Sequence, residues 1–334
     1  MSTELKPDFC QTGNLTAGNR LQSIDVVSVQ STEDRANALT SGHRACQGCG
    51  EALGARMAID KVMELSKNKV HVVNATGCLE VFTTPFPETS WNVPWLHSLF
   101  GNAPAVATGV QAALKAKGME DVTVIAQGGD GSTVDIGFGC LSGMFERNDD
   151  VLYICYDNEA YMNTGVQRSG ATPPTARTAT TPLSGPHPGN NFGQGKNVPK
   201  IAMAHGIAYV ATATIANVRD LEAKVAKAMS MKGARYLHIH VPCPLGWGSL
   251  PKDTIKLARL AVESGLYPLF EGEHGEITGV TKIRKKVPVD EYLKLQRRFV
   301  HLFKKGADTE DLAGVQAIAD AHIKYYGLLD DGEK

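Results

Sequence analysis

Two polar positions at the ends of apolar runs carry the oxygen ligands that a divalent cation prefers. The run 122–126 is followed by the letters GGDG, which contain Asp130, and the run 151–155 is followed by DNE, which contain Asn158. Asp130 offers a carboxylate and Asn158 an amide oxygen, both of which are hard ligands that suit Mg²⁺. The two positions therefore predict a cation site.

The residues around Asp130 favour a phosphate group next to that cation. Gly129 and Gly131 allow phosphate oxygens to approach backbone N–H groups, and a helix expected from Ser132 points its positive end toward them. A GDG triplet alone is weak evidence, because it also occurs in ordinary turns. Followed by the Asn158 cluster at the end of the next apolar run, it resembles the thiamine diphosphate motif.

A strand–helix–strand unit is expected to position Asp130 and Asn158. The run 122–126 and the run 151–155 are expected strands, and the segment between them has apolar residues on one helical face, namely Val134, Ile136, Phe138, Leu141 and Phe145. Such units build parallel sheets, whose strands place their carboxyl ends, and the ligands, at one edge.

Further α/β units surround this one. The patterns predict helices at 52–65, 101–113, 198–205 and 218–231, and strands at 70–74, 207–213 and 235–241. A mainly helical stretch follows, with helices at 252–262, 289–303 and 309–326 and a short β-like patch near 268–284. The long irregular segments 79–100 and 171–196 are expected to be binding or lid loops. His97, in the first loop, is expected to be a scaffold residue rather than a catalytic one.

Composition restricts the class of protein. The chain has 334 residues, with 34 Lys and Arg against 35 Asp and Glu, so it lacks the basic excess of a nucleic-acid-binding protein. It has no long apolar run and no apolar stretch near its start, which predicts a cytoplasmic protein without a membrane span. In such a compartment, seven cysteines favour metal or redox chemistry over disulfides.

Four of these cysteines lie at the ends of expected elements. Cys46 and Cys49 are three positions apart before a helix, and this spacing suits a redox pair, half of a zinc site or part of an iron–sulfur cluster. Cys78 and Cys243 each follow an expected strand. Together the four thiolates could hold zinc or a [4Fe–4S] cluster. Cys140 and Cys155 lie in apolar patterns typical of core thiols, and Cys10 stands alone.

The adjacent thiamine motif favours the cluster. Thiamine diphosphate promotes decarboxylation of a 2-oxoacid, after which electrons remain to be removed. If neither lipoamide nor flavin takes them, a nearby one-electron acceptor is needed, and a cluster fits that role while redox-inert zinc does not.

Six motifs together resemble the β subunit of 2-oxoacid:ferredoxin oxidoreductases, most nearly the pyruvate synthase branch. They cover most of residues 41–250, and they are GHRACQGCG (42–50), NATGCLEVFTTPFP (74–87), VPWLHSLFGNA (93–103), GGDGSTVDIG (128–137), YDNEAYMNTGVQRSGATPP (156–174) and PCPLGW (242–247). The resemblance implies a thiamine diphosphate-binding α/β fold at 41–250, with a mostly parallel sheet and helices on both faces. Residues 1–40 would form an N-terminal arm, and 251–334 a mainly helical extension packed on the domain or on a partner.

The resemblance also implies roles for single residues. Cys46, Cys49, Cys78 and Cys243 would ligate the [4Fe–4S] cluster. Asp130, Asn158 and the backbone carbonyl of Ala160 would hold Mg²⁺ on the diphosphate. Asn163 would lie at the reacting centre as the catalytic polar residue. The other residues implied to contact the cofactor are Gly48, Glu51, Gly77, Gly129, Gly131, Ser132 and Thr164.

Parts of the enzyme are expected on other chains. In this family the glutamate that activates thiamine, and much of the pocket for the substrate and the co-substrate coenzyme A, belong to another subunit, of α type. The run C-x₂-C-x₂-C-x₃-C is absent, so further clusters would lie on a separate small γ/δ-type subunit. Electrons would then pass to ferredoxin or a nicotinamide-linked acceptor, and this chain alone would be inactive.

The sequence differs from the pyruvate enzymes of this family in two places, and both differences bear on the choice of substrate. Pyruvate enzymes usually carry a glutamate at the position of Gly101, and their counterparts of residues 182–197 tend to be basic. A smaller, less charged wall could admit phenylglyoxylate or a branched 2-oxoacid, although pyruvate is favoured. Two other classes compete: a non-redox thiamine lyase whose four cysteines form a structural metal site, and a non-catalytic scaffold subunit.

Overall fold

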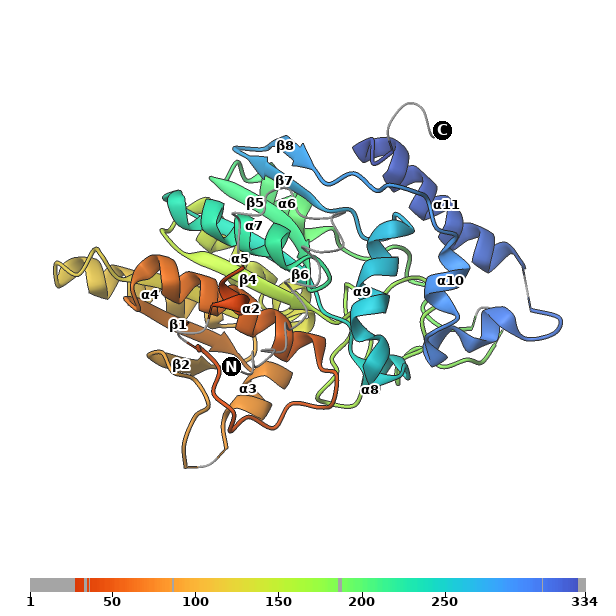
Figure 1. Ribbon diagram of the computed structural model, residues 1–334, viewed down its shortest axis with the longest axis horizontal. Coiled ribbons are helices and arrows are strands. Elements are labelled where there is room, and N and C mark those ends of the chain that lie inside the picture. Colours follow the sequence, from red (N-terminus) through yellow and green to blue (C-terminus); the bar gives the residue numbers. More distant parts are fainter. Residues whose placement is uncertain are drawn as a thin grey trace, which may run out of the picture.

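The computed structural model describes residues 28–32, 35, 37–85, 87–185, 188–307 and 309–329. Within these residues, eight strands form one sheet in the order β2-β1-β3-β4-β6-β5-β7-β8 (Figure 1). The first six in this order run parallel, and β7 and β8 are antiparallel to their neighbours. In chain order the strands are Val70–Ala75, Trp95–Ser98, Thr123–Gly129, Leu152–Asp157, Tyr209–Thr214, Arg235–His240, Phe270–Glu273 and Glu276–Val280.

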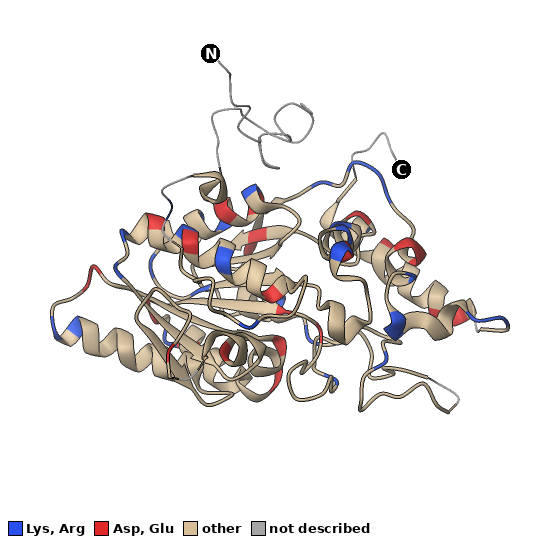
Figure 2. Ribbon diagram, turned by 60° about the horizontal axis from the view of Figure 1, so that its bottom comes forward, with Lys and Arg blue, Asp and Glu red and all other residues tan. Residues whose placement is uncertain are grey.

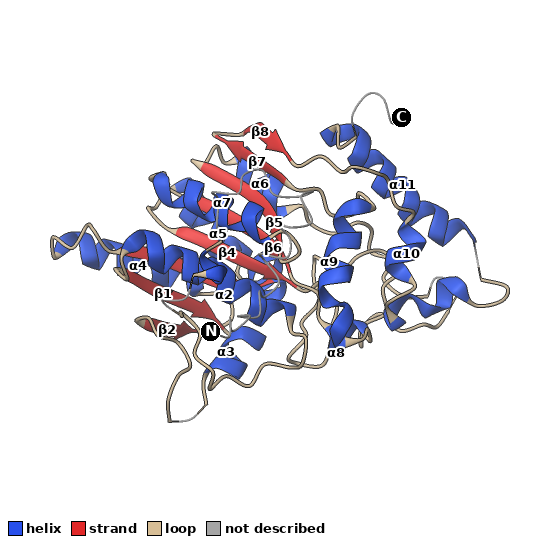
Figure 3. Ribbon diagram, in the orientation of Figure 1, coloured by secondary structure: helices blue, strands red, loops and turns tan. Residues whose placement is uncertain are grey.

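Helices cover both faces of this sheet (Figure 3). On one face, α2 (Gly50–Ser66) and α7 (Val218–Ser230) share an apolar cluster with the strands. On the other, α4 (Ala103–Ala116), α5 (Phe138–Glu146) and α6 (Val198–Ala204) share a second cluster. Because both faces are covered, the central strand β4 is buried at every position, as is usual in parallel sheets. The expected α/β fold is confirmed.

The last part of the chain adds a third apolar cluster beside the carboxyl edge of the sheet (Figure 1). The cluster is formed mainly by α9 (Thr254–Glu263), α10 (Val289–Leu293), the 3₁₀ helix Arg297–Phe303 and α11 (Thr309–Tyr326). The helix expected at 289–303 is therefore divided, because Gln296 adopts an extended conformation. The β-like patch near 268–284 is the hairpin β7–β8, which joins the main sheet.

The central strand–helix–strand unit is confirmed, with one difference in its helix. Strands β3 and β4 are parallel neighbours, with Gly129 opposite Tyr156, so the segments that follow them meet at one edge. The first turns after β3 form a π-helix, Gly131–Ile136, and α5 begins only at Phe138. Since π-helical bonds span five residues instead of four, Ile136 leaves the buried face and is 63% exposed.

Two short elements were not expected in segment 79–100. Helix α3 (Cys78–Thr83) begins directly at a cysteine, and β2 pairs with β1 at the edge of the sheet. The four residues of β2, Trp-Leu-His-Ser, lack a buried face, so only their pairing with β1 identifies them as a strand.

The described part of the N-terminal segment lies against the helices of this chain. Ser28 donates a hydrogen bond to Glu222 in α7 over 2.7 Å, and the backbone N–H of Ala38 donates to Asp60 in α2 over 2.7 Å. The predictions for residues 1–27, including Cys10, fall outside the described residues.

Charged residues are distributed over helices and loops, with basic and acidic side chains interspersed (Figure 2). The strands carry few of them, because both faces of the sheet are covered. Among the described residues, no helix combines the length and the apolar character needed to cross a membrane.

The buried centre of the sheet should dominate stability. Ile154, in β4, is fully buried, so Ile154→Ala should lower the free energy of unfolding by about 2–5 kcal/mol through lost burial and a residual cavity. Ile136→Ala removes the same atoms from an exposed position and should change it by less than about 0.5 kcal/mol. Denaturant titration measures both, and equal effects would contradict this view of the core.

Candidate functional site

A cleft of about 210 Å³ opens where β1, β3 and β4 end. Its walls come from residues 76–78, 129–132, 158 and 160–164, together with Val81, Phe100 and Glu51 in the first turn of α2. Of the residues proposed from the sequence, it brings together Glu51, Gly77, Cys78, Gly129, Asp130, Gly131, Ser132, Asn158, Ala160, Asn163 and Thr164. Gly48 is not among the lining residues; its carbonyl oxygen accepts a hydrogen bond from Thr254, over 2.7 Å.

Asp130 is a buried carboxylate at the end of β3, and it is only 1% exposed. Burial raises its pKa well above the usual value, and the neighbouring Asp157 raises it further. A hydrogen bond from the hydroxyl of Ser169 acts in the opposite direction. A nearby cation would stabilise the ionised form of this carboxylate, because opposite charge favours that form.

Asn158 presents an amide oxygen that has no hydrogen-bond partner among the described residues. Its Nδ2 donates to Glu51 over 3.2 Å, and its backbone carbonyl accepts from the indole N–H of Trp247 over 2.8 Å. Its Oδ1 is buried and accepts no hydrogen bond within the described part of the chain. An unpaired buried oxygen is costly, so the donor set of Asp130 and Asn158 fits a divalent cation.

Glu51 lies between this pair and the cysteines. It lies in the first turn of α2, is 3% exposed, and accepts the hydrogen bond from Asn158 described above. Burial raises its pKa to about 7. Its carboxylate is therefore a second titratable group inside the cleft.

Tyr161 is a cleft residue that sequence reasoning missed. Its hydroxyl donates to the carbonyl of Gly131 over 3.1 Å, and its ring occupies the space that a side chain at Gly131 would need. Asn163 and Thr164 follow it on an exposed turn, where Thr164 donates to Gln167 over 2.6 Å. In the sequence, Tyr161 lies between the candidate residues Ala160 and Asn163, and this position could have indicated that it belongs to the site.

The four cysteines proposed as cluster ligands approach from three separate chain segments. Cys49 precedes α2 and Cys243 precedes α8 (Pro244–Trp247), and each sulfur accepts a backbone hydrogen bond of 3.4 Å from the helix that follows. Cys78 begins α3 and lines the cleft, and Cys46 lies in the exposed turn before Cys49.

The thiols are close enough to affect one another electrostatically. Burial raises the pKa of Cys49 to about 12, with contributions from Glu51 and Cys243, and that of Cys243 to about 11, with contributions from Glu51 and Cys46. The pKa of Cys78 is raised by burial, by Glu51 and by the other three thiols. In the described residues, no three Cys, His, Asp or Glu side chains close around one metal ion.

The remaining candidates lie apart from the cleft. Cys155 is buried within β4, and Cys140 is half-buried in α5. The ring of His97 stacks against Trp95, and its Nε2 lies 2.7 Å from the hydroxyl of Thr76. Thr76 lines the cleft, so His97 contacts the wall of the cleft from outside.

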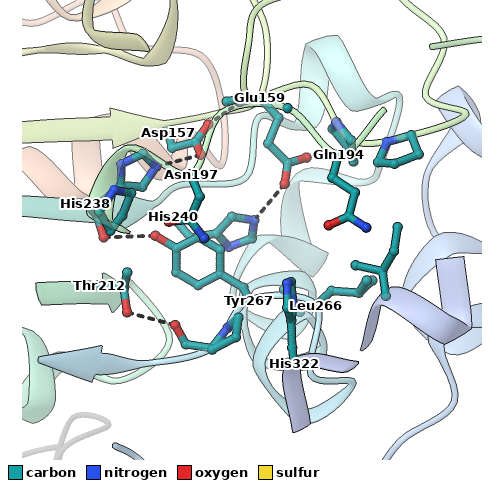
Figure 4. A pocket seen from close by; sticks show the side chains of 18 of the residues that line it. Asp157, Glu159, Gln194, Asn197, Thr212, His238, His240, Leu266, Tyr267 and His322 are labelled. Carbon is teal, nitrogen blue, oxygen red and sulfur yellow. Dashed lines mark hydrogen bonds and ion pairs between the residues drawn. The ribbon is translucent and has the colours of Figure 1, made fainter. Parts of the chain in front are cut away.

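A second cavity of about 220 Å³ lies behind the loop that follows β4 (Figure 4). Asp157 and Glu159 point into it, whereas Asn158, between them, lines the cleft. Asp157 pairs with His238 over 2.8 Å, and Nε2 of His240 lies 3.6 Å from Glu159. Residues of the sheet, of α9 and of α11 line this cavity.

Comparison with known proteins identifies the domain that carries the cleft. Residues 75–239 match the family model described as "Thiamine pyrophosphate enzyme, C-terminal TPP binding domain". A solved 2-oxoglutarate:ferredoxin oxidoreductase from Magnetococcus marinus aligns with a TM-score of 0.50 at 24% identity, covering 71% of this chain and 82% of that one. This structural likeness supports the fold.

Curated relatives identify the family. The pyruvate synthase subunit PorB of Methanosarcina barkeri is 52% identical over 291 residues, which are 87% of this chain and 97% of that protein. PorB of Methanothermobacter thermautotrophicus is 52% identical over 267 residues, covering 79% and 90%. A ketoisovalerate oxidoreductase subunit VorB of Pyrococcus abyssi is 41% identical over 272 residues, covering 79% and 86%. The resemblance read from the motifs is confirmed, and the chain belongs to the family of PorB subunits of pyruvate synthase.

Proposed function

We propose that this chain binds thiamine diphosphate, Mg²⁺ and one [4Fe–4S] cluster, and that the assembled enzyme oxidises pyruvate. In that reaction pyruvate and coenzyme A give acetyl-CoA, CO₂ and one proton, and two electrons leave singly to ferredoxin or another acceptor. One observation carries the proposal: Cys78, a cluster ligand in it, lines the same cleft as Asp130 and Asn158. Electrons released in the cleft therefore have a short path to the cysteines.

The residues of the chain have separate tasks in this proposal. Asp130, the amide oxygen of Asn158 and the carbonyl of Ala160 hold Mg²⁺ on the diphosphate, while Gly129, Gly131 and Ser132 border the phosphates. Bound thiamine diphosphate supplies the carbanion chemistry of decarboxylation. Asn163 is an exposed polar residue that lines the cleft, and it would act at the reacting carbon of the bound cofactor. Tyr161 keeps the loop after β3 in register with the loop after β4.

The chemistry of the proposed reaction supports a cluster rather than zinc. Burial and the neighbouring thiols raise the pKa of Cys49, Cys78 and Cys243, so the four thiols are close enough that they could share one metal centre. Decarboxylation on thiamine diphosphate leaves electrons to be removed, and a [4Fe–4S] cluster carries single electrons whereas zinc is redox-inert.

Exposed apolar side chains in and beside the cleft support a partner subunit of α type that covers it. Val81 lines the cleft, Leu99 precedes the lining residue Phe100, and Leu245 precedes Gly246, which lies against the lining residue Met162. These three side chains and Ile136, which lies against Gly101, are between 50% and 77% exposed. Exposed apolar patches of this kind mark interfaces. The covering subunit would supply the activating glutamate and much of the pocket for pyruvate and coenzyme A, and a small γ/δ-type subunit would carry further clusters.

Packing explains the departure at Gly101. A β-carbon at this position would lie 2.8 Å from the carbonyl oxygen of Ile136, so a side chain would displace the π-helix that follows Asp130. Neither Gly101 nor any described residue of 182–197 lines the cleft. The two departures therefore do not argue for a bulkier substrate, and the PorB relatives favour pyruvate.

The decisive experiment uses the whole complex, purified without oxygen. Reduction of a one-electron acceptor should require coenzyme A and be faster with pyruvate than with phenylglyoxylate or a branched 2-oxoacid. Release of acetaldehyde without acceptor reduction would instead support the lyase. Preference for an aromatic or branched acid would overturn the choice of pyruvate.

Loss of the Asp130 carboxylate should remove this activity. Asp130→Asn deprives the cation of its anionic ligand and should slow pyruvate-dependent acceptor reduction by roughly a hundredfold or more. Asp121→Asn is the control, because Asp121 is an exposed carboxylate paired with Lys69. Unchanged activity in Asp130→Asn would favour a scaffold role.

Gly50 offers a test of the cluster site. A β-carbon there would lie 2.6 Å from the backbone oxygen of Pro242, so Gly50→Ala should push α2, and Cys49 with it, away from Cys243. The wild-type chain should contain about four iron atoms, and the variant should lose most of its iron and visible absorbance. Gly109→Ala, whose methyl group meets nothing within 4 Å, should keep both. A colourless wild-type chain with one zinc ion would contradict the cluster itself.

A further inference from the structure

Glu159 has an unusual backbone conformation at the centre of the proposed magnesium loop. Its φ is 68°, a left-handed value that costs free energy in any residue with a β-carbon. Its neighbours Asn158 and Ala160 both line the cleft, while its own side chain points into the cavity behind (Figure 4). The left-handed conformation of Glu159 thus lets the residues on either side of it, which are both proposed ligands, face one cation.

The backbone of Glu159 is held on both sides. Its N–H donates to Oδ1 of Asp157 over 2.8 Å, and its carbonyl accepts from the hydroxyl of Thr172 over 2.6 Å. Its carboxylate forms an ion pair with Arg298. A strained conformation persists only where surrounding contacts determine it in this way.

Arg298 reaches Glu159 from the 3₁₀ helix in the last third of the chain. Its side chain is only 4% exposed, and its Nε donates to Gln296 over 2.9 Å. Its guanidinium lies 3.9 Å from the centre of the Trp247 indole ring, and the indole N–H donates to the carbonyl of Asn158. One buried cation therefore contacts both Glu159 and the ring that fixes Asn158.

We propose that Arg298 is a positioning residue for the magnesium site. It anchors Glu159 in the left-handed conformation and, through Trp247, fixes the carbonyl of Asn158, so that Asn158 and Ala160 present their oxygens to one cation. This gives the C-terminal part of the chain a role in metal binding, and it depends on the magnesium site proposed above. A planar, stacked guanidinium is needed, and lysine does not replace it.

The test measures metal binding directly, using Mn²⁺ as a paramagnetic probe for Mg²⁺ and the assembled complex with thiamine diphosphate. Arg298→Met should weaken Mn²⁺ binding, followed by electron paramagnetic resonance, by about ten- to a hundredfold. Arg147→Met is the matched control, because Arg147 is an exposed arginine paired with Asp149, and it should bind Mn²⁺ as the wild type does. Wild-type affinity in Arg298→Met would overturn the proposal.

Two double variants separate backbone positioning from simple charge neutralisation, and neither leaves a buried carboxylate unpaired. In E159Q/R298M the charge is gone but the β-carbon remains, so Mn²⁺ binding should stay weak. In E159G/R298M glycine adopts the left-handed conformation freely, so most of the affinity should return. Equal recovery in both would show that Arg298 only neutralises charge and would overturn the proposal. A wild-type complex that binds no Mn²⁺ would instead overturn the proposed function.

Discussion

Burial of Asp130, which has no basic partner among the described residues, is the constraint on which the site depends. Three carboxyl groups, those of Asp130, Asp157 and Glu51, interact in a buried region, and burial together with repulsion from the other two raises the pKa of Asp130. β3 and β4 are neighbouring central strands of the sheet, and their parallel register determines where the acidic segments that follow them lie. A divalent cation would remove this repulsion, and the Oδ1 of Asn158, which accepts no hydrogen bond from the described residues, is placed to share it.

Contacts from the part of the chain after residue 250 help to determine the conformation of the segment that follows β4. The sheet positions the ends of β3 and β4, but it does not determine the conformation of the residues that follow them. Arg298, from a segment packed outside the sheet, neutralises Glu159, and burial alone would otherwise raise the pKa of that carboxyl; the net pKa is lowered. The third apolar cluster, which includes Trp247 and Phe299, holds the segment in place. The edge of the sheet that carries the cleft is therefore stabilised by the two clusters on the faces of the sheet and by this third cluster.

The sequence predicted the parts of this site that local pattern determines. Asp130 and Asn158 follow clear apolar runs, and parallel strands bring such ends together, so their meeting could be foreseen. The exposure of Ile136 could not be predicted, because the formation of a π-helical turn depends on packing and not on the periodicity of apolar residues. Arg298 and Trp247 contact the 158–159 turn across 139 and 89 positions of sequence, and nothing local marks such contacts. The hydrogen bond from Thr254 to the carbonyl of Gly48 could not be predicted either, because the two residues are far apart in the sequence.

Glu51 couples the two halves of the site. It contacts Asn158 in the cleft, and it also contributes to the raised pKa of Cys49, Cys78 and Cys243. A cation beside Asn158 offsets the charge of Glu51, which lowers the electrostatic cost of forming thiolates nearby. Thiolates are the form that binds iron, so in the proposed function Mg²⁺ at one end of the cleft would favour cluster binding at the other. Because such coupling is reciprocal, a bound cluster would act back on the carboxylates through the same residue.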